Sequence, residues 1–187
     1  PEVTYPSDAN KEGQTVYMSE LLKERHPKTC KNLLAILDKY HVNYSFIKGT
    51  KDIWCRDYMP VQTPSGKLIQ FRYDPSYLKG KKELEESRSD VKDVCKKNNI
   101  KAEFSEINLD GGNVLICDGR AILSDRIFEE NPEYDKDALI TKLSQLLECE
   151  IIIIPSLRSK EEDFTGHADG MVRFVNRNTI VGNNRAG

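Results

Sequence analysis

The residues best suited to chemistry lie in the segment T-G-H-A-D-G-M-V-R-F at residues 165–174. His167 and Asp169 stand two residues apart in this segment. The pattern favours a strand, and side chains two residues apart on a strand point to the same face. An imidazole and a carboxylate on one face can grip one small cationic group. The segment therefore predicts part of a binding site for a cation.

Two earlier polar clusters supply further carboxylates. They are D-I-W-C-R-D at residues 52–57 and N-L-D-G-G-N at residues 108–113. Each stands beside a strand-like run, so Asp57 and Asp110 can reach the same point as His167. Taken singly, the clusters are compatible with structural roles, since a His beside an Asp is often a structural hydrogen bond and Gly-Gly is usually a turn. It is their combination and order that indicate a site.

A guanidinium group is the cation that these residues would suit. It is planar, stays charged in water and needs carboxylates placed for bidentate contact, which Asp57 and Asp169 could provide. Binding between two carboxylates polarises the central carbon, so a thiolate can attack it while an imidazole moves protons. His167 is the histidine in a suitable setting, because His26 and His41 stand on or beside helical patterns and are interpreted as surface or cap residues.

In combination the motifs resemble the guanidino-group-modifying superfamily, most closely the agmatine deiminase and Porphyromonas-type peptidylarginine deiminase family. The matched stretches are W-C-R-D at 54–57, D-G-G-N at 110–113 and, most specifically, the segment at 165–174. The resemblance covers most of the chain from Trp54 onward. It implies an α/β fold, the pentein-type propeller of ββαβ units with five-fold pseudosymmetry. Residues 1–187 would be its N-terminal part, a single domain truncated at the C-terminus.

The resemblance also implies roles for single residues. Asp57 matches the guanidinium-binding carboxylate, Asp169 the second substrate carboxylate and His167 the general acid/base. Trp54 matches an aromatic that lines the substrate channel, although a buried core position is an equal alternative. Asp110 replaces the family's usual Glu, which is one methylene longer. We therefore predict His167, Asp57, Asp169 and Asp110 as catalytic, and Trp54, Asp57, Asp110 and Asp169 as substrate contacts.

The activity implied is hydrolysis of agmatine to N-carbamoylputrescine and ammonia, a step of putrescine and polyamine biosynthesis, with no metal or organic cofactor. The family's catalytic cysteine follows a glycine-rich stretch near the C-terminus, and none of the five cysteines has that setting. The nucleophile is therefore expected beyond Gly187. Cys55 is the first thiol to consider otherwise, because the neighbouring Arg56 could lower its pKa. Three alternatives stay open: a peptidylarginine deiminase, a non-catalytic guanidine-binding protein, and an α/β domain whose polar clusters are structural.

Composition narrows the partners. Charged residues make up 31% of the chain and the net charge is −2, which argues against nucleic acid as a partner. No apolar run approaches the roughly 18 residues that span a bilayer, so no membrane is expected. The five cysteines form no CxxC pair and only three histidines are present, which supports neither disulfides nor a zinc site and predicts a reducing cytoplasm. The oligomeric state stays open, a homo-oligomer included.

Hydrophobic periodicity predicts the elements that must position these residues. Their order is a recurring hairpin, helix and strand unit of roughly sixty residues. The expected elements are a helix at 28–40 capped by Thr29, a strand at 42–46, a hairpin of 59–62 with 68–73, a helix at 82–98, a strand at 102–107, a hairpin of 113–117 with 120–124 around Asp118-Gly119, a helix at 135–149, a buried strand at 150–155, and a hairpin of 172–175 with 179–182.

Overall fold

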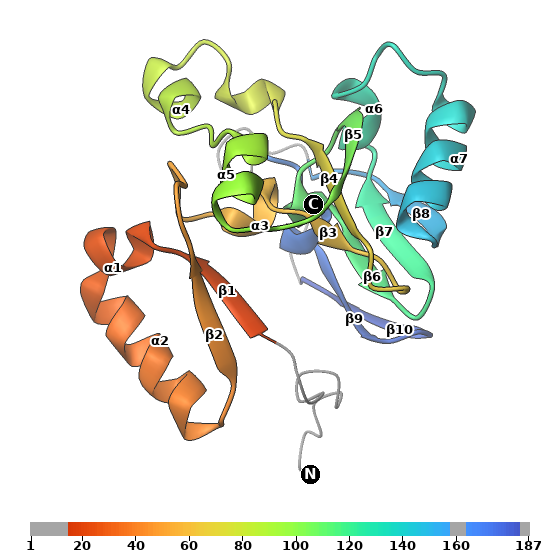
Figure 1. The fold of residues 1–187 in the computed structure, drawn as a ribbon. Helices are drawn as coiled ribbons and strands as arrows, with labels where there is room; N and C mark the ends of the chain where they lie inside the picture. The colour runs from red at the N-terminus through yellow and green to blue at the C-terminus, as the bar shows by residue number, and fades with distance from the viewer. Residues whose placement is uncertain (1–14, 158–163, 184–187) are drawn as a thin grey trace.

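The computed structural model describes residues 15–157 and 164–183. Figure 1 shows the course of the chain. The strands are β1 (Thr15–Ser19), β2 (Asn43–Ile47), β3 (Val61–Gln62), β4 (Leu68–Arg72), β5 (Glu103–Asn108), β6 (Leu115–Cys117), β7 (Arg120–Ser124), β8 (Glu150–Ile154), β9 (Val172–Asn176) and β10 (Thr179–Gly182). The helices are α1 (Leu21–Arg25), α2 (Pro27–Lys39), α3 (Cys55–Tyr58), α4 (Lys82–Glu86), α5 (Val91–Lys97), α6 (Arg126–Glu129) and α7 (Lys136–Leu147), with short 3-10 helices η2 (Ser76–Leu78), η3 (Gly111–Asn113) and η4 (Ala168–Gly170).

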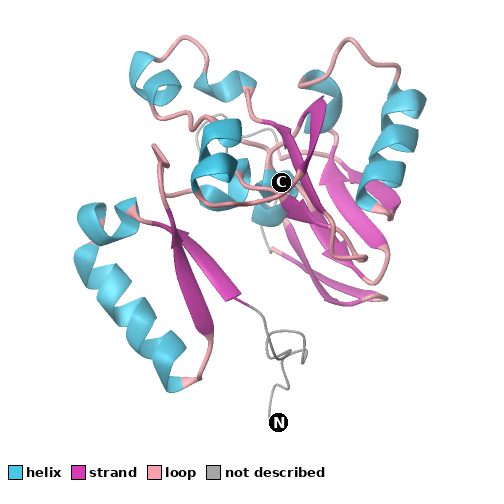
Figure 2. Ribbon diagram, in the orientation of Figure 1, coloured by secondary structure: helices cyan, strands magenta, loops and turns pink. Residues whose placement is uncertain are grey.

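Two three-stranded sheets repeat the same topology. In the first, β3 and β4 form an antiparallel hairpin and β5 pairs in parallel with β4. In the second, β6 and β7 form the hairpin and β8 pairs in parallel with β7. A parallel neighbour needs a crossover connection, and α4 with α5, or α6 with α7, provides it in each case. The predicted hairpin, helix and strand unit is thus confirmed (Figures 1 and 2).

Parts of the same unit lie at both ends of the described chain. The parallel pair β1 and β2 is joined by α1 and α2, which corresponds to the later part of a unit. The hairpin of β9 and β10 corresponds to the earlier part, as predicted. The architecture is therefore mixed α/β, as expected. Closure of such units into a five-fold ring, with these residues as its N-terminal part, stays a prediction.

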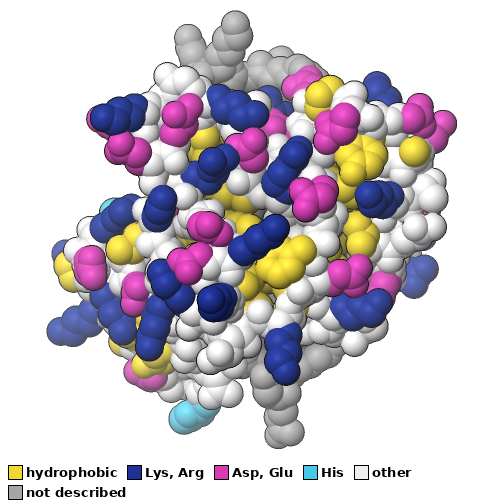
Figure 3. All heavy atoms as spheres, turned by 45° about the horizontal axis from the view of Figure 1, so that its top comes forward, with side chains coloured by type: hydrophobic (Ala, Val, Ile, Leu, Met, Phe, Trp, Pro, Cys, Tyr) yellow, Lys and Arg dark blue, Asp and Glu magenta, His cyan; other side chains and the backbone are white. Residues whose placement is uncertain are grey.

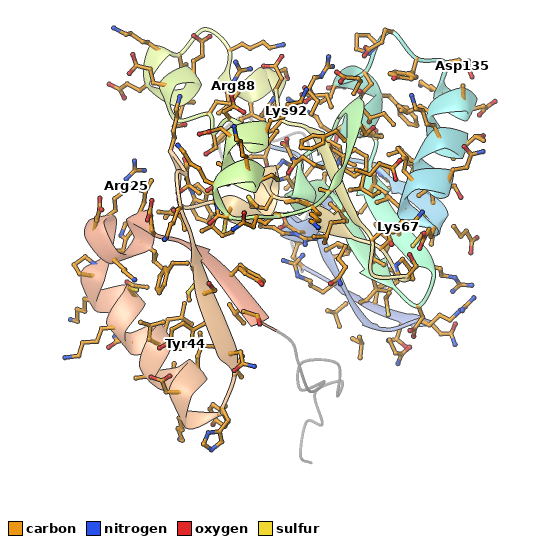
Figure 4. The ribbon with its side chains drawn as sticks, viewed as in Figure 1. Arg25, Tyr44, Lys67, Arg88, Lys92 and Asp135 are labelled. Carbon is orange, nitrogen blue, oxygen red and sulfur yellow. The ribbon has the colours of Figure 1, made fainter. Side chains whose placement is uncertain are left out.

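The main hydrophobic core lies between the two three-stranded units and α7. Leu139, Leu143 and Leu147 recur every four residues on one face of α7 and are all fully buried. They pack with β7, whose Ala121 and Leu123 belong to the same cluster. Asp135 begins this helix, because its carboxylate accepts hydrogen bonds from the backbone N–H groups of the first helical turn. Figure 4 shows Asp135 at the start of α7.

The turn between β6 and β7 explains why the second hairpin was predictable. Asp118 and Gly119 both have positive φ, at 45° and 76°. A two-residue hairpin turn of this kind matches the twist of its strands and favours Asp-Gly. The turn sets the register that pairs Cys117 with Arg120.

Several predicted bounds were wrong for local reasons. The helix expected at 82–98 is broken into α4 and α5, since the Ser87 hydroxyl bonds back to Leu84 O and Asp90 caps a new helix. The first long helix starts at Pro27 rather than at a Thr29 cap, because proline is well suited to a first helical turn. The four isoleucines of β8 are half-buried rather than buried, since β8 is an edge strand.

Charges of both signs are mixed over the surface. In Figure 3, Lys and Arg side chains alternate with Asp and Glu over the face shown, and hydrophobic atoms appear between them. This face therefore presents no broad area of a single charge. Among the described residues, no helix has the length and apolar character to cross a membrane.

Candidate active site

The three polar clusters lie on or directly beside short helical elements. Asp57 lies on α3, and Asp110 lies between β5 and η3. His167 directly precedes η4, which contains Asp169, so the predicted strand is wrong here: β9 begins only at Val172. Gly166 shapes the approach with a φ of 65°, in the left-handed region that glycine tolerates.

Gly112 is the point at which the side chains meet. A Cβ atom on this glycine would lie 2.5 Å from Asp57 Oδ1, 2.6 Å from His167 Nδ1 and 3.3 Å from Asp169 Oδ2. The backbone N–H of Gly112 also donates a hydrogen bond of 3.1 Å to Asp57 Oδ1. Glycine is therefore required for close approach, and the structure brings three predicted residues around it.

Asp110 lies on the other side of the imidazole. Its Oδ2 is 2.7 Å from His167 Nε2, whereas His167 Nδ1 is 3.6 Å from Asp57 Oδ1. A neutral imidazole that donates from Nε2 to a carboxylate keeps its lone pair on Nδ1. Asp110 thus favours the tautomer whose basic nitrogen faces Asp57 and Gly112.

Burial separates the carboxylates into two kinds. The side chains of His167 and Asp110 are only 7% and 9% exposed, whereas those of Asp57 and Asp169 are 20% and 31% exposed. A ligand that enters from solvent would meet Asp57 and Asp169 first. Asp110 is placed to hold the imidazole, and its predicted contact with substrate stays a prediction.

The site perturbs the ionisation of two groups. Burial raises the pKa of Asp57 to about 6; the positive charge of a protonated His167 opposes this, and the nearby charges of Asp110 and Asp169 add to it. Burial by itself would lower the pKa of His167, but the hydrogen bond to Asp110 and the three surrounding negative charges raise it above its ordinary value. A cation that enters this cluster of three carboxylates would compensate their repulsion.

Neighbouring residues fix the loops that carry the cluster. Asn113 Oδ1 accepts hydrogen bonds from Ser124 N at 2.8 Å and Ala168 N at 3.1 Å, which ties β7 to η4. Arg56 donates to Val114 O at 2.5 Å, which ties α3 to the residue before β6. Arg173 pairs with a carboxylate of the site, since its guanidinium is 3.8 Å from Asp169 Oδ2.

Trp54 lies on the surface. Its side chain is 66% exposed at the start of α3, which rules out the buried core alternative. Its backbone N–H donates to Asp52 Oδ1 at 2.9 Å. An exposed indole next to the segment that carries Asp57 remains available for the predicted role in lining a channel.

The thiol of Cys55, the first candidate from the sequence, is not activated. Cys30, Cys95 and Cys149 are buried, and Cys117 ends β6. Cys55 is half-buried with its Sγ 3.8 Å from Tyr17 O, and burial raises the pKa of this thiol. The expectation that Arg56 would lower it is therefore wrong, because loss of hydration is the largest influence on this thiol and the nearby charge of Asp57 acts in the same direction.

One site residue was missed by sequence reasoning. The hydroxyl of Tyr77 in η2 donates to Asp110 Oδ2 at 3.0 Å, and its ring contacts the ring of His167 edge to face. Tyr77 stands in the polar loop after β4, outside all three motifs, so neither spacing nor periodicity singled it out.

Among the described residues, no group of three or more His, Cys, Asp or Glu side chains is arranged to hold a metal ion.

Solved structures share this fold. The agmatine deiminase of C. jejuni matches with a TM-score of 0.66 and 18% identity over 90% of this chain and 60% of that one. The agmatine deiminase of Enterococcus faecalis matches with a TM-score of 0.53 and 18% identity over 87% and 45%. DDAH from Pseudomonas aeruginosa, with 12% identity, reaches a TM-score of 0.52 over 85% and 58%. The chain thus spans about three fifths or less of these proteins, and no curated protein sequence matches it.

Fold and site together define an α/β protein with the fold of solved deiminases, in which a histidine and carboxylates gather around a glycine. The sequence model for the Porphyromonas-type peptidyl-arginine deiminase family matches residues 9–186, nearly the whole chain. The chain belongs to this family, and the resemblance inferred from its three motifs is confirmed.

Proposed function

We propose that the chain is part of a hydrolase that converts a guanidino group into a ureido group with release of ammonia, and that agmatine is its substrate. The observation that carries the proposal is the convergence of Asp57, Asp169 and His167 at Gly112. Two partly exposed carboxylates beside a buried imidazole suit a planar cation with outward-pointing donors. Its relation to agmatine deiminases of the same fold supports the choice of substrate.

In the proposed mechanism, Asp57 and Asp169 accept hydrogen bonds from the guanidinium and orient its central carbon. A thiolate adds to that carbon, and His167 protonates the departing nitrogen, so that ammonia leaves and a covalent thiouronium remains. His167 then takes a proton from water as the water adds to the same carbon. As this second intermediate collapses, its C–S bond breaks, the proton of its hydroxyl group passes to the released ammonia or to solvent, and the ureido product and the thiolate are released. Asp110 keeps Nδ1 of His167 directed at the reacting atoms.

The thiol is proposed to come from a segment outside these 187 residues. The local candidate Cys55 has its Sγ against the carbonyl of Tyr17, and burial raises the pKa of its thiol. This is the opposite of what an activated thiol needs. The same observation favours a second candidate function, a guanidine-binding protein without catalysis.

A third candidate is a peptidylarginine deiminase, which the description of the family itself supports. The two enzymatic candidates differ in substrate size, since a peptide needs an open approach to Asp57 and Asp169. Exposure of 20% and 31% at these side chains is compatible with either.

The experiment compares the 187-residue chain with the longer polypeptide that contains it. Ureido product is measured colorimetrically from agmatine and from an arginine-containing peptide. We expect turnover of agmatine by the longer polypeptide alone, and its loss in Asp57→Asn and His167→Ala. Cys55→Ser is the matched control and should leave turnover unchanged.

Each outcome decides between the candidates. Product from the 187-residue chain that disappears in Cys55→Ser would refute the external thiol. Preference for the peptide would replace agmatine deiminase by peptidylarginine deiminase. Tight agmatine binding without product from the longer polypeptide would favour the non-catalytic binding protein.

A further inference from the structure

A tyrosine lies behind the pair formed by His167 and Asp110. The Tyr77 hydroxyl donates to Asp110 Oδ2 at 3.0 Å, and the same oxygen is 2.7 Å from His167 Nε2. We propose that Tyr77 is a positioning residue: it holds the Asp110 carboxylate and limits how strongly that carboxylate binds the imidazole. This inference deepens the proposed function, on which its catalytic meaning rests, but its test needs no substrate.

The ring of Tyr77 is held on two sides. Its centroid lies 5.9 Å from that of His167 and 5.5 Å from that of Phe164, at interplanar angles of 67° and 73°. Edge-to-face contacts at these distances are favourable for aromatic rings. The three rings therefore form a row with Tyr77 at its centre, and the hydroxyl of this central ring reaches Asp110.

The loop that carries Tyr77 is anchored just ahead of it. The amide of Asn108 accepts from Asp74 N at 2.8 Å and donates to Asp74 O at 2.9 Å. The carboxylate of Glu130 accepts from Ser76 N at 2.9 Å and from the Ser76 hydroxyl at 2.6 Å. Two paired contacts hold this segment, one from Asn108 at the end of β5 and one from Glu130 directly after α6.

Water has little room to replace the hydroxyl. The cavity lined by Tyr77, Asp110 and His167 measures about 10 Å³, at the lower limit for a single water molecule. Both recorded hydrogen bonds to this carboxylate end on Oδ2, and both come from protein groups. Among the described residues, the recorded donors to it are His167 and Tyr77.

The effect of the hydroxyl on the imidazole has a definite sign. A protonated imidazole partly neutralises Asp110, so the hydrogen bond from Tyr77 is stronger when His167 is neutral. Tyr77 remains a donor throughout, since burial and the charge of Asp110 raise the pKa of its hydroxyl. By linkage, the hydroxyl favours neutral His167, and its removal should raise the pKa of His167. The charged or titratable groups that surround this region are Asp110 before η3, Asp57 on α3, Asp169 on η4, Tyr77 on η2, Tyr73 directly after β4, and the ion pair of Arg126 with Glu130 at α6.

The test is an NMR titration of His167 in protein carrying isotope-labelled histidine, with Tyr77→Phe as the variant. Phenylalanine keeps the ring in the aromatic row and removes only the oxygen. We expect the protonation constant of the imidazole to rise about threefold, because the variant removes only the difference in strength of this hydrogen bond between neutral and protonated His167, a fraction of one hydrogen bond. Phe164→Leu is the matched control, because it removes a ring from the row and leaves the hydroxyl; it should leave the constant unchanged.

A second variant guards against misfolding of the first. Site-specific 3-fluorotyrosine at position 77 has nearly the same shape and a more acidic hydroxyl, so it should act as a stronger donor and lower the protonation constant. Opposite shifts in the two variants would support the proposal. An unchanged or lowered constant in folded Tyr77→Phe, or no response to fluorotyrosine, would overturn it. Both titrations stay decisive even if the chain proves to have no deiminase activity.

Discussion

Binding of a guanidinium ligand should strengthen as the pH rises from 5 to 7. The perturbation acts on Asp57, whose pKa burial raises to about 6. This carboxyl is then about 9% ionised at pH 5 and about 91% ionised at pH 7, so the binding-competent fraction changes about tenfold. Protonation of His167 at low pH adds a repelling positive charge beside the same ligand. Tenfold is therefore the smallest change that we expect.

The assay is isothermal titration calorimetry with agmatine on the 187-residue chain, which is predicted to have no turnover. Repeating the titration in buffers of different ionisation enthalpy counts the protons exchanged. Near pH 6 the ligand should release roughly half a proton from Asp57. Asp57→Asn is the control, and it should bind more weakly and lose that share of the proton release.

A result of opposite sign would refute this reasoning. If the affinity for agmatine were constant from pH 5 to 7, or highest at pH 5, Asp57 would be either fully ionised or not a ligand. Proton release that persists in Asp57→Asn would assign the titration to another group, with His167 as the nearest candidate.

Three further predictions concern the same residues. The folded state holds the proton of Asp57 more tightly than the unfolded state does, so the stability contributed by protonated Asp57 is lost as the pH rises from about 4 to 6. Asp57→Asn should therefore raise the melting temperature at pH 7 but not at pH 4. The gain in the free energy of unfolding at pH 7 should be at most about 3 kcal/mol. Gly112→Ala should abolish agmatine binding in a folded protein, since its Cβ would meet Asp57 and His167, whereas Gly111→Ala should lower the melting temperature because its Cβ would meet the Arg56 carbonyl. Agmatine should bind better than putrescine, whose ammonium ends cannot form a fork of donors, and Asp169→Asn should remove most of this preference in calorimetry.

The sequence predicted the elements whose signals are local. The Asp118-Gly119 turn needs positive φ at both positions, and the leucines of α7 recur at helical spacing, so both elements were identified. The short elements were missed because they carry no such local signal. Helix α3 is four residues long, too short for a periodic pattern, yet it is the element that carries Asp57.

The meeting of the site residues depends on contacts far apart in sequence. The motifs indicated which side chains would gather, but the expected strand at His167 and Asp169 is a 3-10 turn. What brings them together is the absence of a side chain at Gly112 and the double hydrogen bond of Asn113 to two other segments. Neither feature has a periodic signal, so only the structure could reveal them.

The length of the Asp110 side chain determines which atoms of the site its carboxylate can reach. A carboxylate on the short aspartate arm stays near its own backbone, where it reaches His167 Nε2 and the Tyr77 hydroxyl with the same oxygen. Asp57 and Asp169 are left as the more exposed carboxylates, on the side of the imidazole where Nδ1 lies. In the proposed mechanism, recognition of the cation and control of the proton are thus divided between different carboxylates. This division explains why a change at Tyr77 should alter the titration of His167 while agmatine recognition remains with Asp57 and Asp169.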